Sequence, residues 1–338
     1  MIMSLPPITL TLACYQQEPF IAAAVRSALA QDYSPLEILI SDDCSRDSTY
    51  DIIKEEVERY RGPHTVVLNR NPQNMGLEHV NRQLELARGE FIVRCHGDDI
   101  SFPHRVRRLV EEWQSRRCSL ISSNAVMIDA EGHETGLLTK RTQSRLVPAE
   151  EIIGRDWQRT MLGASFAWER EVVSLFGPID KRVYPVALDH IFPFRATLLK
   201  GFVFLAEPLL RYRVHSGNAH HSIADKTGSR LVMEETLAGF NVSSRMRMGD
   251  DLTILRQRGV GQDVLERVRP LLQLDISKRL RHWLQLRQHL ISSGQRPTWV
   301  DKAVLNAKGS RPEYGLNPSP MPDDPTPVRD GLSSSEAS

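Results

Sequence analysis

The feature that most constrains this chain is the regular alternation of short apolar segments with amphipathic segments over residues 1–125. The short segments are rich in β-branched residues, and we expect strands at 8–13, 36–41, 65–68 and 91–95. The segments between them carry apolar residues at helical spacing, and we expect helices at 19–31, 49–61 and 77–88. Strands that alternate with helices of about a dozen residues form βαβ units. The sequence therefore predicts an α/β fold, a mostly parallel central sheet with helices on both faces.

The pattern changes after residue 119. We expect one or two strands at 119–128, a helix at 189–199, a strand at 202–205 and only helices at 231–290. The last segment is rich in Pro, Ser, Gly and Asp, a composition that buries too little apolar surface to offset its ordering entropy. We therefore predict an α/β domain at 1–225, a helical region at 226–309 and a disordered tail at 310–338.

Charge and cysteine content exclude several classes of protein. Lys and Arg number 43 against 42 Asp and Glu, whereas a protein that coats nucleic acid needs a strong basic excess. No apolar run reaches the roughly 18 residues that suggest a membrane-spanning helix. The four cysteines form no CxxC pair, and this scattered spacing argues against a zinc site or a disulfide scaffold. We expect a cytoplasmic protein with no nucleic-acid partner.

Acidic residues follow two of the expected strands. Asp42 and Asp43 follow the second strand, and Asp98 and Asp99 follow the fourth. In an open α/β sheet, ligands bind beyond the carboxyl ends of the strands, so both pairs should lie at one edge and repel each other. Either pair alone could instead cap turns and helices. Both pairs together favour a binding site that contains a cation.

The chain lacks the glycine-rich motifs that usually bind phosphates. No GxGxxG follows the first strand, and no GxxxxGK[ST] occurs anywhere in the sequence. A carboxylate cannot face a phosphate directly, but it can accept from a base or a ribose hydroxyl, or hold Mg²⁺ or Mn²⁺ that bridges to phosphate. This chemistry points to a metal-bound nucleoside-diphosphate compound.

These residues belong to an ordered set of motifs. The set runs through Ala13-Cys14-Tyr15, Asp42-Asp43-Cys44-Ser45, Asn74-Met75-Gly76, Ala87-Arg88-Gly89-Glu90, Gly97-Asp98-Asp99 and Tyr212-Arg213-Val214-His215. In order and spacing, roughly residues 7–222 resemble the family-2 glycosyltransferases with the GT-A fold. That resemblance implies an inverting transfer of a sugar from a nucleotide sugar, assisted by a divalent cation.

The resemblance also implies roles for single residues. Asp189 would be the catalytic base. Asp98 would hold the metal, and His215 lies in a segment whose histidine is near the metal or diphosphate in some members. Trp168 would lie near the acceptor, although core packing explains it as well. The nucleotide sugar would be bound by Ala13, Tyr15, Glu18, Asp42, Asp43, His96 and Asp98.

Two positions depart from the family's pattern. His96 replaces the first carboxylate of the family's Asp-x-Asp motif, and imidazole suits Mg²⁺ poorly, which leaves the choice between Mn²⁺ and Mg²⁺ open. Leu188 precedes Asp189 where the family often has Glu, but one carboxylate is enough for a base. These two departures favour the alternative that the chain is a non-catalytic sugar- or partner-binding relative of the family. Nucleotidyl transfer to a sugar phosphate is a further alternative.

The helical region carries a basic excess over residues 230–296. One interpretation is contact with an anionic membrane face at the inner side of the membrane, or with a lipid-diphosphate acceptor. A solvated helix that covers the domain is the plainer interpretation. The acceptor itself is open, since a glycan, a lipid-linked sugar or a small molecule would all fit.

Overall fold

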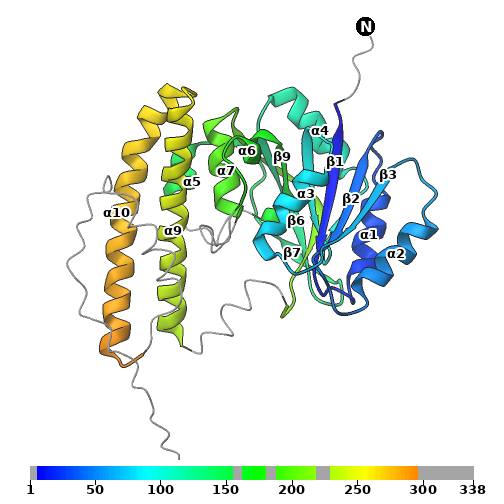
Figure 1. Ribbon diagram of the computed structural model, residues 1–338, viewed down its shortest axis with the longest axis horizontal. Coiled ribbons are helices and arrows are strands. Elements are labelled where there is room, and N and C mark those ends of the chain that lie inside the picture. The colour runs from blue at the N-terminus through cyan, green and yellow to red at the C-terminus, as the bar shows by residue number, and fades with distance from the viewer. Residues whose placement is uncertain (1–5, 155–161, 180–187, 218–228, 296–338) are drawn as a thin grey trace, which may run out of the picture.

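A mixed sheet forms the centre of the computed structural model, which describes residues 6–154, 162–179, 188–217 and 229–295 (Figure 1). Within this part of the chain the strand order is β3-β2-β1-β4-β9-β6-β10-β5. The strands that carry the first site motifs are β1 (Ile8–Cys14), β2 (Glu37–Asp42), β3 (Thr65–Arg70) and β4 (Phe91–His96). They pair in parallel, which confirms the predicted α/β fold with a mostly parallel sheet.

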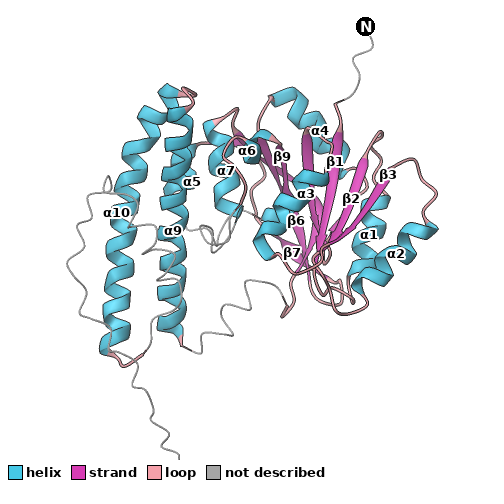
Figure 2. Ribbon diagram, viewed as in Figure 1, coloured by secondary structure: helices cyan, strands magenta, loops and turns pink. Residues whose placement is uncertain are grey.

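Helices cover both faces of this sheet (Figure 2). One face packs against α1 (Ile21–Leu29), α2 (Thr49–Arg59) and α4 (Arg105–Arg116). The other packs against α3 (His79–Leu86), α5 (Ala149–Gly154), α6 (Glu171–Ser174) and α7 (Leu188–Leu198). Along β2, Ile38 and Ile40 join the first core and Leu39 joins the second, because successive side chains of a strand point to opposite faces. A strand buried on both faces is therefore apolar throughout.

The second half of the sheet is less regular than the first. The strand β9 (Phe166–Glu169) lies antiparallel between β4 and β6 (Leu120–Ile128). The short strands are β5 (Ile100–Ser101), β7 (Glu134–Leu137) and β8 (Arg145–Val147), and one-turn helices occur at η1 (Gly76–Glu78) and η3 (Gly163–Ser165). The region expected to hold one or two strands, 119–128, thus contains one long strand, Leu120–Ile128.

The strand β10 (Phe202–Arg213) is longer than the expected strand at 202–205. Its pairing with β6 shifts register on either side of Pro208. Proline lacks the backbone donor that a regular ladder needs, so it is accommodated at such an irregularity. Because the strand resumes after Pro208, it carries Tyr212 and Arg213 to the edge of the sheet where β4 also ends.

The predicted helical region forms a hairpin of α9 (Arg230–Gln257) and α10 (Gln262–Ser292) beside α7 (Figure 1). Met248, Leu252 and Leu255 of α9 belong to the same buried cluster as Phe192 of α7 and Ile92 of the sheet. The hairpin therefore shares its core with the α/β domain. The predicted boundary at 225 and the predicted tail at 310–338 lie outside the described residues. None of the described helices is both long and apolar enough to cross a bilayer.

Candidate active site

The carboxyl ends of β1, β2 and β4 meet at one edge of the sheet. The register places Cys14 beside Asp42 and Ala13 beside His96. The chain turns immediately after these residues, and the backbone N–H of Gly97 donates to the carbonyl of Ala13 over 3.0 Å. The predicted positions Ala13, Asp42 and His96 are thus brought together, as the parallel arrangement requires.

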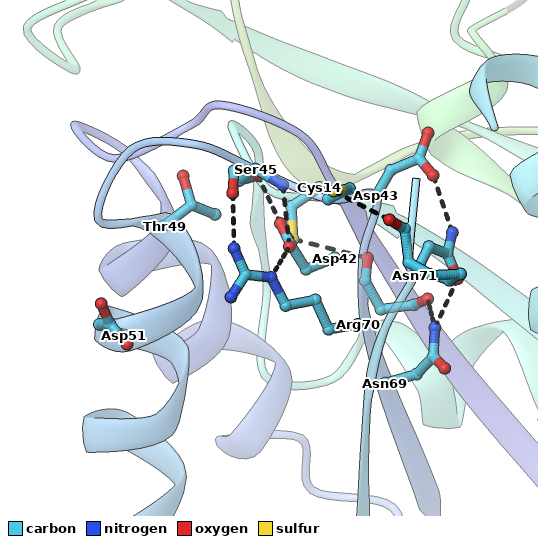
Figure 3. A network of polar contacts seen from close by, with 12 residues as sticks. Cys14, Asp42, Asp43, Ser45, Thr49, Asp51, Asn69, Arg70 and Asn71 are labelled. Carbon is cyan, nitrogen blue, oxygen red and sulfur yellow. Dashed lines mark hydrogen bonds and ion pairs between the residues drawn. The ribbon is translucent and has the colours of Figure 1, made fainter. Parts of the chain in front are cut away.

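Asp42 is fully buried at the end of β2 (Figure 3). Its carboxylate accepts the backbone N–H of Ser45 at 3.0 Å and the hydroxyl of the same residue. The Nε atom of Arg70 lies 3.4 Å away. Arg70 itself lies over the ring of Tyr50. These contacts shape the turn that leaves β2, and a direct contact of Asp42 with a nucleotide stays a prediction.

Asp43 anchors the loop that follows β3. Its Oδ1 atom accepts the side-chain amide of Asn71 at 2.7 Å and the backbone N–H of Met75 at 2.9 Å. Its Oδ2 atom accepts the backbone N–H of Gly76 at 2.8 Å. Gly76 has a φ of +60°, a conformation that favours glycine. The Asn74-Met75-Gly76 motif is therefore a loop held by a carboxylate, and the predicted ligand role of Asp43 stays a prediction.

Tyr15 and Glu18 lie on the loop after β1. Tyr15 is 41% exposed, and it follows directly on the residues that end the strand. The carboxylate of Glu18 accepts the backbone N–H of Ser48 at 2.9 Å, while its own backbone N–H donates to Asp47 at 3.3 Å. Glu18 therefore joins this loop to the start of α2, and Tyr15 offers an accessible aromatic face.

Beyond β4, three side chains form a candidate metal site. Ligand atoms of His96, Asp98 and Asp99 all lie within 4.8 Å of one another. The Oδ2 atom of Asp99 and the Nε2 atom of His96 are buried and have no hydrogen-bond partner in the described part of the chain. Three ligand groups this close together, two of which keep a buried atom without a hydrogen-bond partner, fit a divalent cation.

Electrostatics distinguish the members of this cluster. Burial raises the pKa of Asp99 well above its usual range, and the neighbouring charge of Asp98 raises it further. Burial lowers the pKa of His96 well below its usual range, and Arg94 and Arg105 lower it further. Both shifts favour the neutral form of the group; neutral imidazole is the form that binds a metal, and a cation that binds to Asp99 competes with its proton.

The segment after β10 closes over the same cluster. His215 places its Nε2 atom 3.1 Å from Oδ2 of Asp98, and its ring lies 4.7 Å from that of Phe20. Arg213 donates from its backbone to Asp99 and from Nε to the carbonyl of Asp98, each over 3.0 Å. The structure thus brings the predicted metal residues Asp98 and His215 together.

Asp189 lies in the first turn of α7, on the face of the sheet that β4 presents through Ile92 and His96. A methyl group placed on Gly163 would lie 2.1 Å from Oδ1 of Asp189, so the carboxylate packs directly on that glycine. Its neighbour Leu188 is buried in the core, which suits an apolar residue at the position where the family often has Glu. The next residue, His190, lies with its Nδ1 atom 3.0 Å from Nη1 of Arg245 in α9, within hydrogen-bonding distance.

Sequence reasoning missed Tyr212 as a site residue. Burial raises the pKa of its phenol, and the charges of Asp99, Asp98 and Asp189 raise it further, in that order. The charges of both the metal cluster and the candidate base therefore act on the phenol of Tyr212. The expected strand at 202–205 ended too early to indicate this. Trp168 is 1% exposed and packs against Phe192 at 5.2 Å, so a contact with the acceptor stays a prediction.

Residues 9–174 match the family model of glycosyl transferase family 2. The chain belongs to that family. It is 26% identical over 230 residues to an uncharacterized glycosyltransferase of Nostoc sp., which covers 66% of this chain and 69% of that protein. It is 28% identical to the succinoglycan biosynthesis protein ExoO of Rhizobium meliloti, over 42% of this chain and 39% of that protein.

Two solved structures show the same fold. The TarS protein of S. aureus in complex with UDP-GlcNAc is 17% identical, with a TM-score of 0.50 over 86% of this chain and 92% of that one. The mannosyltransferase PcManGT of Pyrobaculum calidifontis, in complex with GDP-Man and Mn²⁺, is 15% identical, with a TM-score of 0.51 over 91% of this chain and 80% of that one. This chain is a family-2 glycosyltransferase with the GT-A fold.

Proposed function

We propose that this glycosyltransferase moves a sugar from a nucleoside-diphosphate sugar to an acceptor hydroxyl in one displacement with inversion. One observation carries the proposal: ligand atoms of His96, Asp98 and Asp99 lie within 4.8 Å of one another at the end of β4, and α7 holds Asp189 on the same face of that strand. A displacement needs a site for the leaving diphosphate and a base for the attacking hydroxyl, on either side of the anomeric carbon. The complexes of the two structural neighbours with UDP-GlcNAc and GDP-Man support such a donor.

In this proposal the residues divide the chemistry between them. Asp189 takes the proton of the acceptor hydroxyl on a carboxylate oxygen as that hydroxyl attacks, a role that contributes about 10²–10⁴-fold to the rate. Asp98, Asp99, His96 and His215 would hold the divalent cation, which supplies positive charge opposite the departing diphosphate. Arg213 contacts both aspartates, since its backbone N–H donates to the carboxylate of Asp99 and its Nε donates to the backbone carbonyl of Asp98.

The donor set of the metal site favours Mn²⁺ over Mg²⁺. Imidazole nitrogen suits transition metals, whereas Mg²⁺ prefers oxygen ligands only. His96 and His215 both lie at the cluster. The complex of the Pyrobaculum calidifontis mannosyltransferase with Mn²⁺ agrees with this choice. We expect Mn²⁺ to bind more tightly than Mg²⁺ when each is titrated into the protein.

The decisive experiment compares Asp189→Asn with the wild-type protein. Release of nucleoside diphosphate is followed with Mn²⁺ over a panel of nucleotide sugars, and donor binding is followed by thermal shift. We expect Asp189→Asn to bind the donor and to lose turnover by at least about 10²-fold. Asp263→Asn is a matched control, because Asp263 also stands in the first turn of a long helix. Unchanged turnover in Asp189→Asn would refute the base assignment.

The same assay separates the alternative functions. A non-catalytic binding relative would bind a nucleotide sugar and release nothing with any acceptor or with water. A sugar-phosphate nucleotidyltransferase would release pyrophosphate from a nucleoside triphosphate. The transferase proposal requires nucleoside diphosphate as the product.

We also propose that α10 meets an anionic surface, such as a membrane that carries a lipid-linked acceptor for polysaccharide or glycolipid synthesis. The basic residues of α10 fall into two groups. Arg279 forms an ion pair with Asp275, whereas Lys278, Arg281 and His282 are exposed. Leu274, which is 67% exposed, shares that outer side. Pelleting with anionic vesicles at low salt tests the idea, and no binding refutes it. A cytoplasmic location stays a prediction.

A further inference from the structure

Arg94 is an arginine inside a strand that is otherwise built for the core. It is the fourth residue of β4, and the apolar residues Phe91, Ile92 and Val93 that precede it are fully buried. Side chains alternate along a strand, so Arg94 shares a face with Ile92 and His96. Ile92 belongs to the core that α7 covers. The guanidinium therefore projects from the sheet toward the side on which Asp189 stands.

Arg94 has no partner within the described residues. No described side chain or backbone group forms a hydrogen bond or an ion pair with its guanidinium, and its Nε atom is buried without an acceptor. Burial lowers the pKa of Arg94, and the charge of Asp189 is what opposes this effect. Arg94 as a whole is half-buried, and its Nη atoms are not among the buried atoms without a partner, so the donors at the tip of the guanidinium are open to a ligand.

The nearby Arg105 shows what a structural arginine looks like in this fold. Its Nη2 atom donates to the carbonyls of Arg94 and Ala164, each over 2.7 Å, and its Nη1 atom donates to Ser101 over 3.0 Å. Arg105 thereby ties β4 to the η3 turn. The turn also contains Gly163, on which Asp189 packs. The backbone of Arg94 is therefore held next to the turn that supports the candidate base.

Arg94 lies on the same face of β4 as His96, and α7 with Asp189 covers that face. A strand rises by about 3.3 Å per residue, so Arg94 lies roughly 7 Å deeper than His96 on the same face. His96 belongs to the metal cluster, and Asp189 is the carboxylate whose negative charge raises the pKa of Arg94. In a single displacement the sugar lies between the leaving diphosphate and the attacking hydroxyl. The group that reaches Arg94 is therefore the sugar and not the nucleotide.

We propose that Arg94 binds the transferred sugar, its guanidinium donating hydrogen bonds to oxygen atoms of that sugar. Arginine has five donors and no acceptor, so the ligand must present acceptor oxygens. Hydroxyl groups and a carboxylate both meet this need, and a planar guanidinium matches a carboxylate best. This inference rests on the proposed function, because it takes the ligand to be a nucleotide sugar.

The first experiment uses the protein without any ligand. Arg94→Met removes the unpaired charge and keeps an apolar stem, so we expect the melting temperature to stay the same or to rise. Arg105→Met is the matched control, and we expect its melting temperature to fall because four groups lose a buried donor. An Arg94→Met protein that melts as low as Arg105→Met would overturn the inference, since it would show a structural role.

The second experiment separates the sugar from the nucleotide. Binding of UDP, GDP, UDP-GlcNAc, GDP-mannose and UDP-glucuronate is measured with Mn²⁺ present, for the wild-type protein and for Arg94→Met. For the nucleotide sugar that the wild-type protein binds best, we expect Arg94→Met to lose about tenfold or more in affinity. We expect its affinity for the matching nucleoside diphosphate to change by less than about twofold. An equal loss for both ligands would overturn the inference.

The two hypotheses fail in different ways. If no nucleotide or nucleotide sugar of the panel binds to the wild-type protein, the proposed function fails. The melting temperatures then remain as the only test of whether Arg94 has a structural role. If a nucleotide sugar binds and Arg94→Met binds it equally well, the inference about Arg94 fails while the proposed function stands. A loss confined to UDP-glucuronate assigns an acidic donor sugar, and a loss with UDP-GlcNAc or GDP-mannose assigns a neutral one.

Discussion

The ion pair of Arg195 and Asp251 joins α7, the helix that carries Asp189, to the C-terminal hairpin. Both side chains are 0% exposed, and the guanidinium meets the carboxylate twice, at 2.9 Å and 3.1 Å. Arg195 also lies 4.7 Å from the ring centroid of Phe176. A bidentate pair without access to water holds its two helices in one geometry. It thus bears both on stability and on the position of the candidate base.

Replacing Asp251 with Leu leaves the Arg195 guanidinium buried without its carboxylate. Breaking a buried pair from one side costs about 3–5 kcal/mol. At about 2–4 °C per kcal/mol for a chain of roughly this size, the melting temperature should fall by about 6–20 °C. The double variant Arg195→Met, Asp251→Leu removes both charges and keeps the volume. We expect it to recover to within about 1–2 kcal/mol of the wild-type protein.

Urea denaturation of the wild-type protein, both single variants and the double variant gives the coupling energy between the two positions. Arg247 lies 3.4 Å from Asp251 but also 3.4 Å from Asp250, so it keeps a carboxylate in every variant. A double variant as unstable as Asp251→Leu would show that the loss comes from packing. A single variant that costs less than about 1 kcal/mol would show that the pair is not desolvated, which would also refute the reasoning.

Three further predictions concern the site itself. Gly163→Ala places a methyl group 2.1 Å from Oδ1 of Asp189, so we expect turnover to fall by about 10²-fold with donor binding kept, and an unchanged rate would contradict the packing described here. Binding of Mn²⁺ should strengthen as the pH rises, because the pKa of Asp99 is raised and the cation needs the ionised form; calorimetry that finds an affinity independent of pH would count against this. Asp43→Asn should lower the free energy of unfolding by about 2–3 kcal/mol, since an amide cannot accept all the donors that the carboxylate accepts, whereas Asn71→Ala should cost about 1 kcal/mol in the same urea titration.

Much of the fold could be read from local pattern. Apolar runs such as Leu36–Ile40 and the amphipathic segments between them are periodic over a few residues, and periodicity is set by backbone geometry before any tertiary contact forms. Parallel strands also carry their carboxyl ends to one edge, which is why Asp42 and Asp98 could be expected at one site. Where the pattern was irregular it predicted less, as with β10, whose second half follows the interruption at Pro208.

The sequence by itself determined which chemical groups reach the edge of the sheet, because the common direction of the first four strands follows from the alternation of strands and helices along the chain. Only the tertiary structure decided how those groups are paired. It placed His215 on Asp98 across 117 residues, filled both oxygens of Asp43 with loop donors, and gave the guanidinium of Arg94 no partner among the described residues. Pairing depends on burial and on side chains that arrive from distant segments. The same residue types can therefore be a cap, a ligand or an unsatisfied charge until packing selects one of these roles.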